Sequence, residues 1–191
     1  MSKRLGLITL LGLVVALWTP SPAPANEQLW SLLKNGGQVV LMRHTVTTPG
    51  AGDPPGMRID DCNTQRNLIE EGRQHARQIG DAFRARGVTV DRVLSSPWCR
   101  CIETARLAFG KAEAWQSLAN LFGRSENEGK QVSELRAFVS QRREGNVVLV
   151  SHGSTIAALT GVSLGTGEMV VVSAQGAGNF AVNGRLSVPS S

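Results

Sequence analysis

The chain of 191 residues has no cluster of basic side chains, although its formal net charge is +5. Its lysines and arginines are dispersed, and its aromatic residues are limited to five phenylalanines and four tryptophans. Nucleic-acid-binding domains usually carry a basic patch or stripe on one face. We therefore expect no nucleic-acid partner, and the modest positive balance suits a small anionic ligand.

The N-terminal apolar run is too short to span a bilayer comfortably. It extends from Leu5 to Trp18, follows two basic residues and precedes the small-residue segment TPSPAPA. This order of regions is typical of a secretory signal peptide, whereas a spanning helix needs about 20 apolar residues. We predict a signal peptide over residues 1–25 and a single mature domain over residues 26–191, with an uncleaved membrane anchor as the alternative.

Export would place the mature chain in the periplasm or outside the cell, with no stable membrane span after processing. No cysteine lies directly after the apolar run, so a lipoprotein anchor is not supported. Removal of Lys3 and Arg4 with the leader lowers the formal net charge from +5 to +3.

Cysteine is scarce, with only Cys62, Cys99 and Cys101. Their spacing is not that of a zinc site. An oxidising compartment permits a disulfide, but residues two apart on one helix point to different sides. Cys62 is therefore expected to pair with either Cys99 or Cys101; the alternative is that all three thiols are reduced or buried.

Strand-like and helix-like segments alternate along the mature chain, which is typical of an α/β fold. We predict a three-layer sandwich, with a mostly parallel central sheet and helices on both faces. A loop rich in proline and glycine, residues 45–64, is long enough to suggest a functional role. The expected helices are 26–37, 67–87, 97–109, 131–143 and 155–160, and the expected strands are 39–42, 88–95, 146–151, 167–173 and 178–183.

Local signals refine two of these helices. Asn67 and Glu70 have the spacing of a capping box at the start of one helix, and Gly87 suits its end. Ser96 is a good N-cap residue and precedes a proline at the start of another. His75 lies between charged neighbours, so we interpret it as a solvated surface residue.

Three predicted strands end in polar residues. The segment VVLMRH ends in Arg43 and His44, VLSSPWCR leads to Ser96 and Arg100, and VVLVSH ends in His152. In parallel sheets, binding sites form at the carboxyl ends of the strands. If these strands are neighbours, two arginines and two histidines converge at one place.

Such a group of side chains suits a phosphoryl anion. Two arginines would neutralise its oxygens, one histidine could attack phosphorus, and a second, protonated histidine would add positive charge. The amides at a helix start would contribute as well. The chain has neither a CxxxxxR phosphatase loop nor an aspartate-rich metal site, so we expect no metal and no cofactor. Each motif alone is weak, but all three at three strand ends favour a phosphate site.

The segments LMRHTVT, LSSPWCRCIETA and VVLVSHGSTIAALTG, together with QRNLIEEGRQHARQIG, resemble the histidine phosphatase superfamily, which has a phosphoglycerate mutase-like fold. The resemblance implies that His44 becomes transiently phosphorylated. It also implies that Arg43, Arg100 and His152 complete the phosphate pocket and that Thr47 contacts the phosphate.

The chain departs from the usual family pattern in three respects. No asparagine lies a few residues after the RH pair, where many mutases have one. Thr45 follows the RH pair, where the family usually has glycine. The acid that protonates the leaving group is not evident. Its candidates are Asp53, Asp61, Glu126 and Glu168, and Glu168 opens a strand near the expected site. Ser96, Thr47 and Glu168 are the candidate substrate-binding residues.

The sequence thus predicts an exported, metal-independent phosphatase of the histidine acid type. It would hydrolyse a small phosphomonoester, such as a sugar phosphate, through a phosphohistidine on His44. A mutase is less well supported, because the short chain has little inserted structure. The alternatives are a non-catalytic phosphate-ligand-binding protein of the same fold and a structural or partner-binding protein.

Overall fold

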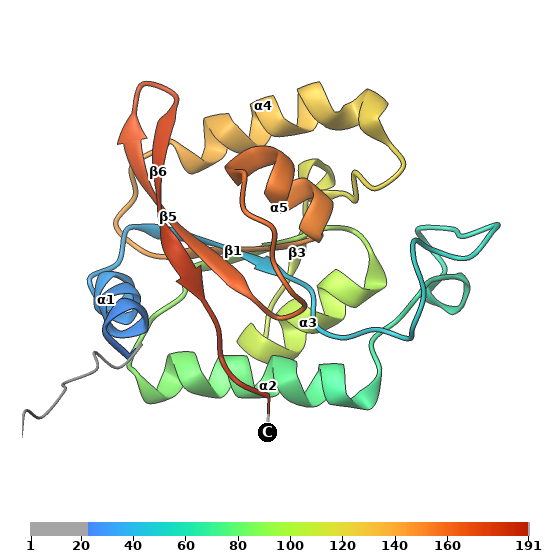
Figure 1. Ribbon diagram of the computed structural model, residues 1–191, viewed down its shortest axis with the longest axis horizontal. Helices are drawn as coiled ribbons and strands as arrows, with labels where there is room; N and C mark the ends of the chain where they lie inside the picture. Colours follow the sequence, from blue (N-terminus) through green and yellow to red (C-terminus); the bar gives the residue numbers. More distant parts are fainter. Residues whose placement is uncertain (1–22, 191) are drawn as a thin grey trace, which may run out of the picture.

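A computed structural model of the protein describes residues 23–190. Its centre is a six-stranded sheet with the strand order β3-β2-β4-β1-β5-β6 (Figure 1). The first four strands in this order pair in parallel, and β5 and β6 add an antiparallel hairpin at one edge. This arrangement confirms the predicted mostly parallel sheet. The strands are β1 Gln38–Arg43, β2 Arg92–Ser95, β3 Glu113–Ala114, β4 Val147–Ser151, β5 Met169–Gly176 and β6 Asn179–Leu186.

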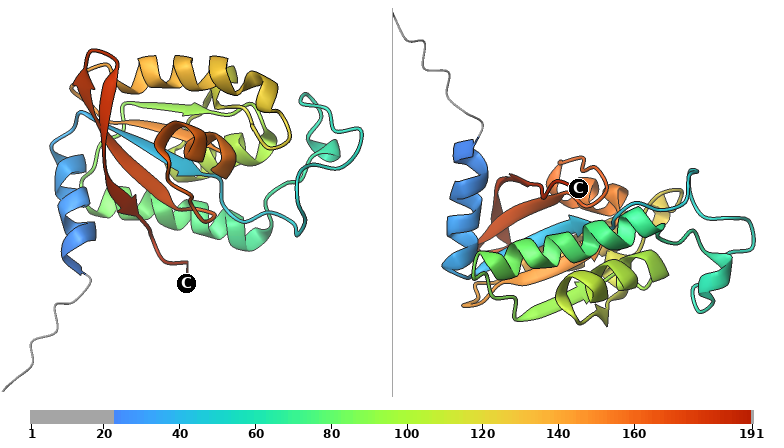
Figure 2. Two further views of the ribbon diagram at one scale, coloured as in Figure 1. Left: turned by 45° about the horizontal axis from the view of Figure 1, so that its top comes forward. Right: turned by 90° about the horizontal axis from the view of Figure 1, so that it is seen from below.

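Five α-helices cover the two faces of the sheet and complete the predicted three-layer sandwich (Figure 2). On one face lie α1 Ala23–Lys34, α2 Glu70–Ala85 and α3 Cys99–Phe109, and on the other lie α4 Glu128–Val139 and α5 Gly153–Thr160. Three short 3-10 helices occupy the loops: η1 Cys62–Thr64, η2 Gln116–Leu118 and η3 Ser125–Asn127. Across residues 23–190, no helix combines the length and apolar character needed to cross a membrane.

The predicted signal peptide, residues 1–25, lies outside the described residues except for its last three positions. These three positions open α1, so this helix begins before the expected residue 26.

Alternating residues of the central strands explain why their sequences are apolar without interruption. In β1, Val40 and Met42 pack against the layer of α1, α2 and α3. Val39 and Leu41 point the other way and pack against the layer of α4 and α5. A strand buried on both faces must be apolar at every position, as the sequence pattern indicated.

Some predicted boundaries were wrong. The strand expected from residue 88 begins at Arg92, because parallel pairing with β4 starts only there. Residues 88–91 form the connection from α2, and Asp91 N donates to Asn146 O (3.0 Å). The helix expected over 131–143 is α4, which begins and ends several residues earlier, since its polar first turn carries no periodic apolar signal.

The predicted start of α2 was also wrong. The N-cap residue is Ile69, without a side-chain cap, and no capping box forms. Asn67 instead donates its side-chain N–H to Cys62 O at 2.6 Å. Asn67 therefore stabilises the preceding loop and not the helix.

His75 is not the solvated residue that its charged neighbours suggested. Only 8% of its surface is exposed, and its Nε2 lies 2.8 Å from Val188 O. A Cβ atom added to Gly167 would lie 2.3 Å from Cε1 of the ring, so this glycine allows the close approach. The C-terminal segment and the turn before β5 thus cover a histidine that local sequence placed at the surface.

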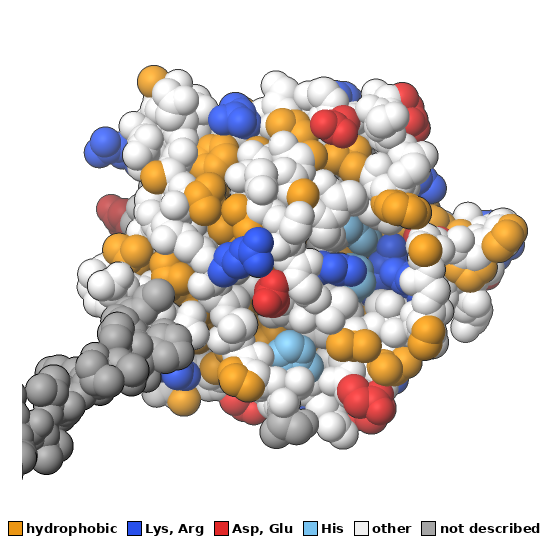
Figure 3. All heavy atoms as spheres, viewed as in Figure 1, with side chains coloured by type: hydrophobic (Ala, Val, Ile, Leu, Met, Phe, Trp, Pro, Cys, Tyr) orange, Lys and Arg blue, Asp and Glu red, His pale blue; other side chains and the backbone are white. Residues whose placement is uncertain are grey.

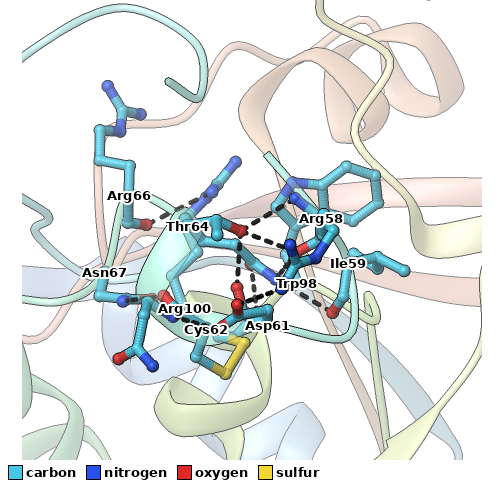
Figure 4. The surroundings of a disulfide bond; sticks show 12 residues. Arg58, Ile59, Asp61, Cys62, Thr64, Arg66, Asn67, Trp98 and Arg100 are labelled. Carbon is cyan, nitrogen blue, oxygen red and sulfur yellow. Dashed lines mark hydrogen bonds and ion pairs between the residues drawn. A yellow bond between two sulfur atoms is a disulfide. The ribbon is translucent and has the colours of Figure 1, made fainter. Parts of the chain in front are cut away.

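The open question of cysteine pairing is answered by a disulfide between Cys62 and Cys99 (Figure 4). Cys101 is free and buried. The bridge joins residues 37 apart in sequence and attaches the loop after β1 to the first turn of α3.

Loss of this bridge should destabilise the fold. A disulfide that closes a loop of this length restricts the unfolded chain, and its removal typically lowers the free energy of unfolding by about 2–4 kcal/mol. We expect a decrease in this range for the double variant Cys62→Ser/Cys99→Ser, measured by urea denaturation. Reduction of the wild type should lower its midpoint in the same way and leave that of the double variant unchanged. Equal midpoints for oxidised wild type and double variant would contradict the prediction.

Candidate active site

A pocket of about 480 Å³ lies where β1, β2 and β4 end. These three strands are neighbours, because β4 pairs with both β1 and β2. The pocket is lined by Arg43 at the end of β1, His44 directly after it, Arg100 in the first turn of α3, and His152 after β4. Figure 3 shows histidine and basic side chains gathered in a hollow of this face. The structure thus brings together the four residues predicted to be catalytic.

His44 is buried, and its hydrogen bond defines which ring nitrogen is available for reaction. Its Nδ1 lies 2.8 Å from Thr45 O. A carbonyl only accepts, so Nδ1 carries the proton and Nε2 keeps a lone pair. Burial lowers the pKa of His44 to about 3; the Thr45 hydrogen bond opposes this shift, whereas the positive charges of the nearby arginines contribute to it. The neutral ring suits a nucleophile.

The ring nitrogens of His152 contact three neighbours, one of which is Cys101, whose Sγ lies 3.5 Å from Nε2. Nδ1 of His152 lies 3.5 Å from Nη2 of Arg100, and Nε2 lies 2.8 Å from Ser96 Oγ. A guanidinium only donates, so Nδ1 accepts and Nε2–H donates to Ser96. Burial, followed by the charge of Arg100, lowers the pKa of His152 well below its usual value. A phosphate dianion in the pocket would raise the pKa of His152, because its negative charge opposes the effect of the arginine charges.

A third arginine, Arg66, lines the pocket beside Arg43 and Arg100. The Nε atoms of all three arginines are buried and have no hydrogen-bond partner within the described chain. Arg43 is held in place by Nη1, which donates to Leu164 O at 2.7 Å. Buried donors without partners are costly, so three of them around one pocket indicate a site for an anion with several oxygens.

Asp53 reaches Arg100 from the long loop and forms a buried ion pair with it. Oδ1 lies 2.5 Å from Nη1 of Arg100, Oδ2 lies 3.2 Å from Nη2, and Trp98 Nε1 donates to Oδ2 at 2.9 Å. Burial opposes ionisation of Asp53, but the hydrogen bond and charge of Arg100, with the Trp98 bond, outweigh it and hold the pKa below its usual value. Asp53 is therefore an anion, unsuited to donating a proton.

The net charge around the pocket follows from the three arginines, Asp53 and the two histidines. Three arginines and one carboxylate leave two positive charges, with both histidines neutral. A phosphate monoester dianion carries two negative charges, so it would neutralise the site. Complementary charge of this kind favours phosphate over singly charged anions.

Ser96, Thr47 and Glu168, the predicted substrate-binding residues, do not line the pocket. Ser96 is fully buried behind His152. It is also not the predicted N-cap, because α3 begins at Cys99 with Trp98 as its N-cap. Thr47 forms a β-bridge with Leu68, and Glu168 accepts a hydrogen bond from Gly165 N at 2.6 Å.

The remaining candidate acids also lie outside the pocket lining. Asp61 pairs with Arg58 in the loop (2.5 Å), and Glu126 lies exposed in η3. Within residues 23–190, no group of three or more His, Cys, Asp or Glu side chains is placed to hold a metal ion.

Arg66, Asn120 and Phe122 line the pocket but were missed by sequence reasoning. A signal for Arg66 was available: pairing of Cys62 with Cys99 brings the end of the loop beside Arg100. Figure 4 shows Arg66 and Arg100 close to this bridge. Asn120 and Phe122 follow η2, where no periodic pattern indicates a site.

The two histidines should make the fold sensitive to acid. Their pKa values are lower in the folded state than the 6.5 of an unperturbed histidine, so below about pH 6.5 the unfolded chain binds more protons. The contribution of the two neutral histidines to the free energy of unfolding is therefore fully present above this pH. As the pH falls toward their folded-state pKa values, the free energy of unfolding decreases by about 1.4 kcal/mol per pH unit for each histidine. Urea denaturation between about pH 6 and 4.5 measures this slope. His44→Gln should reduce the slope by about half of the histidine contribution; an unchanged slope would contradict the assignment.

Comparison with known proteins confirms the resemblance found in the sequence. Residues 39–131 match the histidine phosphatase superfamily (branch 1). No protein of curated function matches the chain in sequence.

Solved structures share the fold at low sequence identity. The protein histidine phosphatase SixA, complexed with tungstate, has 21% identity and a TM-score of 0.59, covering 78% of this chain and 96% of its own. Phosphoserine phosphatase from Entamoeba histolytica, in complex with 3-phosphoglyceric acid, has 15% identity and a TM-score of 0.61, covering 80% and 98%. The product of open reading frame Rv3214 from Mycobacterium tuberculosis has 17% identity and a TM-score of 0.57, covering 81% and 97%.

Proposed function

We propose that this chain, whose residues 39–131 match the histidine phosphatase superfamily, is a phosphatase that hydrolyses phosphomonoesters through a phosphohistidine on His44. The observation that carries the proposal is the set of three buried, unpartnered arginine Nε donors around a pocket that also contains the neutral His44. The tungstate complex of SixA, a structure of the same fold, supports an oxyanion site.

In the first step, Arg43, Arg66 and Arg100 hold the phosphoryl oxygens. Nε2 of His44 attacks phosphorus, and the bond to the leaving oxygen breaks. The hydrogen bond from Nδ1 to Thr45 O stabilises the positive charge that the ring acquires. Water then attacks the phosphohistidine, the P–N bond breaks, and phosphate leaves with His44 restored.

His152 and Ser96 form a second part of the mechanism. Ser96 fixes the orientation and tautomer of His152, whose Nδ1 is on the Arg100 side of the ring. Protonation of His152 in the phosphate complex would add positive charge that stabilises the transition state. Ser96 is thus a positioning residue in this scheme and not a contact to substrate.

The proposal includes metal independence, export and a histidine acid type of phosphatase. Support for export comes from the N-terminal pattern and from the Cys62–Cys99 disulfide, since disulfides persist mainly in oxidising compartments. A small phosphomonoester of the cell envelope is the proposed substrate; the sequence alone suggested a sugar phosphate as one example.

The test is hydrolysis of p-nitrophenyl phosphate by the mature chain with a chelator present. We expect turnover that chelator does not reduce, and competitive inhibition by inorganic phosphate and tungstate. Loss of turnover with chelator would refute metal independence.

A second candidate is a phosphate-ligand-binding protein without turnover. It is favoured by one observation: no aspartate or glutamate lines the pocket within the described residues. Tungstate binding without any turnover, and without a phosphoenzyme, would support this candidate over the phosphatase. Failure to bind tungstate would leave only the structural or partner-binding alternative.

A further inference from the structure

Within the described chain, the pocket lining lacks a carboxyl group that could protonate a leaving group. Asp53 lies behind the wall and directs both oxygens to Arg100 and Trp98. The carboxylate of Glu168 is bound to Gly165 N. Among residues 23–190, the pocket lining therefore supplies no carboxyl group for general acid catalysis.

The histidines do not fill this role at the pocket rim. His44 and His152 are each 3% exposed and form the floor with Arg100. His152 directs Nε2 to Ser96 and Nδ1 toward Arg100. The leaving oxygen must lie opposite His44 across phosphorus, because displacement is in line. It therefore lies on the side of phosphorus away from the His44 imidazole.

The pocket lining includes an exposed aromatic ring beside polar residues such as Asn120 and Ser154. Phe122 is 61% exposed, and its backbone N donates to Asn120 Oδ1 at 3.1 Å. A Cβ atom added to Gly52 would lie 3.6 Å from Phe122 Cε1, so the ring sits directly against the loop after β1. Gly50 and Ala51 of this loop also line the pocket. Without bulky side chains from the loop, a flat group has access to the Phe122 ring.

We infer that the substrates are aryl phosphates, in which phosphate is esterified to a phenolic oxygen and the ring stacks on Phe122. This inference rests on the proposed phosphohistidine mechanism. The Nε2–P bond forms as the P–O bond breaks, and the leaving group departs as a phenolate with the electron pair. Solvent then protonates the phenolate. A phenolate tolerates this departure because its negative charge is delocalised.

Sugar phosphates are disfavoured by the same reasoning. Their leaving oxygen is an alkoxide, which is far more basic and needs a proton during bond cleavage. General acid catalysis typically contributes about 10²–10⁴-fold to a rate. An enzyme without it should be slower on alkyl phosphates by at least this factor, which narrows the substrate range expected from the sequence.

The test compares kcat/KM across para-substituted phenyl phosphates, a glycerol phosphate and a sugar phosphate. This quantity is the right one because it includes the departure of the leaving group but not hydrolysis of the phosphoenzyme. We expect kcat/KM to fall steadily as the leaving phenol becomes more basic, and alkyl phosphates to be at least about 100-fold slower than phenyl phosphate. A smaller difference would overturn the inference.

Variants at Phe122 test the stacking contact separately. Phe122→Ala should raise KM for phenyl phosphate by about 3- to 10-fold, as expected for loss of an aromatic contact. The inhibition constant of inorganic phosphate should stay within about twofold, and Phe122→Trp should preserve the wild-type KM. An unchanged KM in Phe122→Ala would refute stacking.

A chain that is not a phosphatase at all would give a result different from that of a phosphatase with another substrate class. In that case, no phosphate ester of either kind yields a phosphohistidine, detected by mass spectrometry of acid-sensitive, base-stable phosphoprotein. A phosphohistidine formed equally from aryl and alkyl phosphates would uphold the mechanism and overturn the substrate class.

Discussion

Replacement of His44 by alanine is expected to lower kcat/KM for p-nitrophenyl phosphate by more than about 10⁴-fold, because the nucleophile of the covalent step is lost. Steady-state hydrolysis assays measure the loss. Labelled phosphoprotein, present in the wild type after rapid quenching, should be absent from the variant. Activity within about 100-fold of wild type would show that another group attacks phosphorus.

Two controls separate chemistry from folding in this experiment. His44→Ala should still bind tungstate, because the three arginines remain. Thr47→Val should retain activity within about threefold of wild type, since Thr47 does not line the pocket although the family resemblance placed it at the phosphate. A large loss of activity in Thr47→Val would show that Thr47 does contribute to substrate binding or catalysis.

The second large effect is expected at Asp53. Asp53→Asn leaves the guanidinium of Arg100, which is 1% exposed, without its counter-charge. Removal of one partner of a buried ion pair typically costs about 3–5 kcal/mol. We expect a loss of this size in the free energy of unfolding, measured by urea denaturation. Added phosphate should stabilise Asp53→Asn more than wild type, because the anion supplies the missing charge.

Asp81→Asn is the matched control. Asp81 pairs with Arg84 on the surface of α2 at 2.7 Å, and both side chains are more than 60% exposed. Exposed pairs contribute about 0–1 kcal/mol, so this variant should unfold at nearly the wild-type midpoint. Equal losses at Asp53 and Asp81 would show that burial of the Asp53–Arg100 pair has no energetic consequence.

Much of the site could be predicted because sheet geometry is regular. Residues that follow parallel strands meet at one edge, so Arg43, His44 and His152 were found from strand endings alone. The sequence did not show whether the three strands are neighbours in the sheet. The structure shows that they are, because β4 pairs with both β1 and β2. Arg100 followed from its place in the first turn of α3.

The parts that sequence could not predict depend on irregular backbone. Asp53 was named only as a candidate acid, and its pairing with Arg100 was not foreseen, because no periodicity in the loop after β1 relates spacing to position. His75 was misjudged because its cover, Val188, comes from a segment 113 residues away. Local charge patterns report neighbours along the chain, whereas burial here is decided by contacts between distant segments.

The two margins of the sheet affect how copies of the chain meet one another. On one side, β3 has only two residues, which leaves little backbone on which a foreign strand could add. On the other, β6 is long, but its pairing with β5 is interrupted by two register irregularities, and Arg185 lies along it. Short, irregular or charged edges oppose strand addition and hence aggregation. The β5–β6 hairpin therefore completes the sheet and also hinders the addition of strands from other copies of the chain.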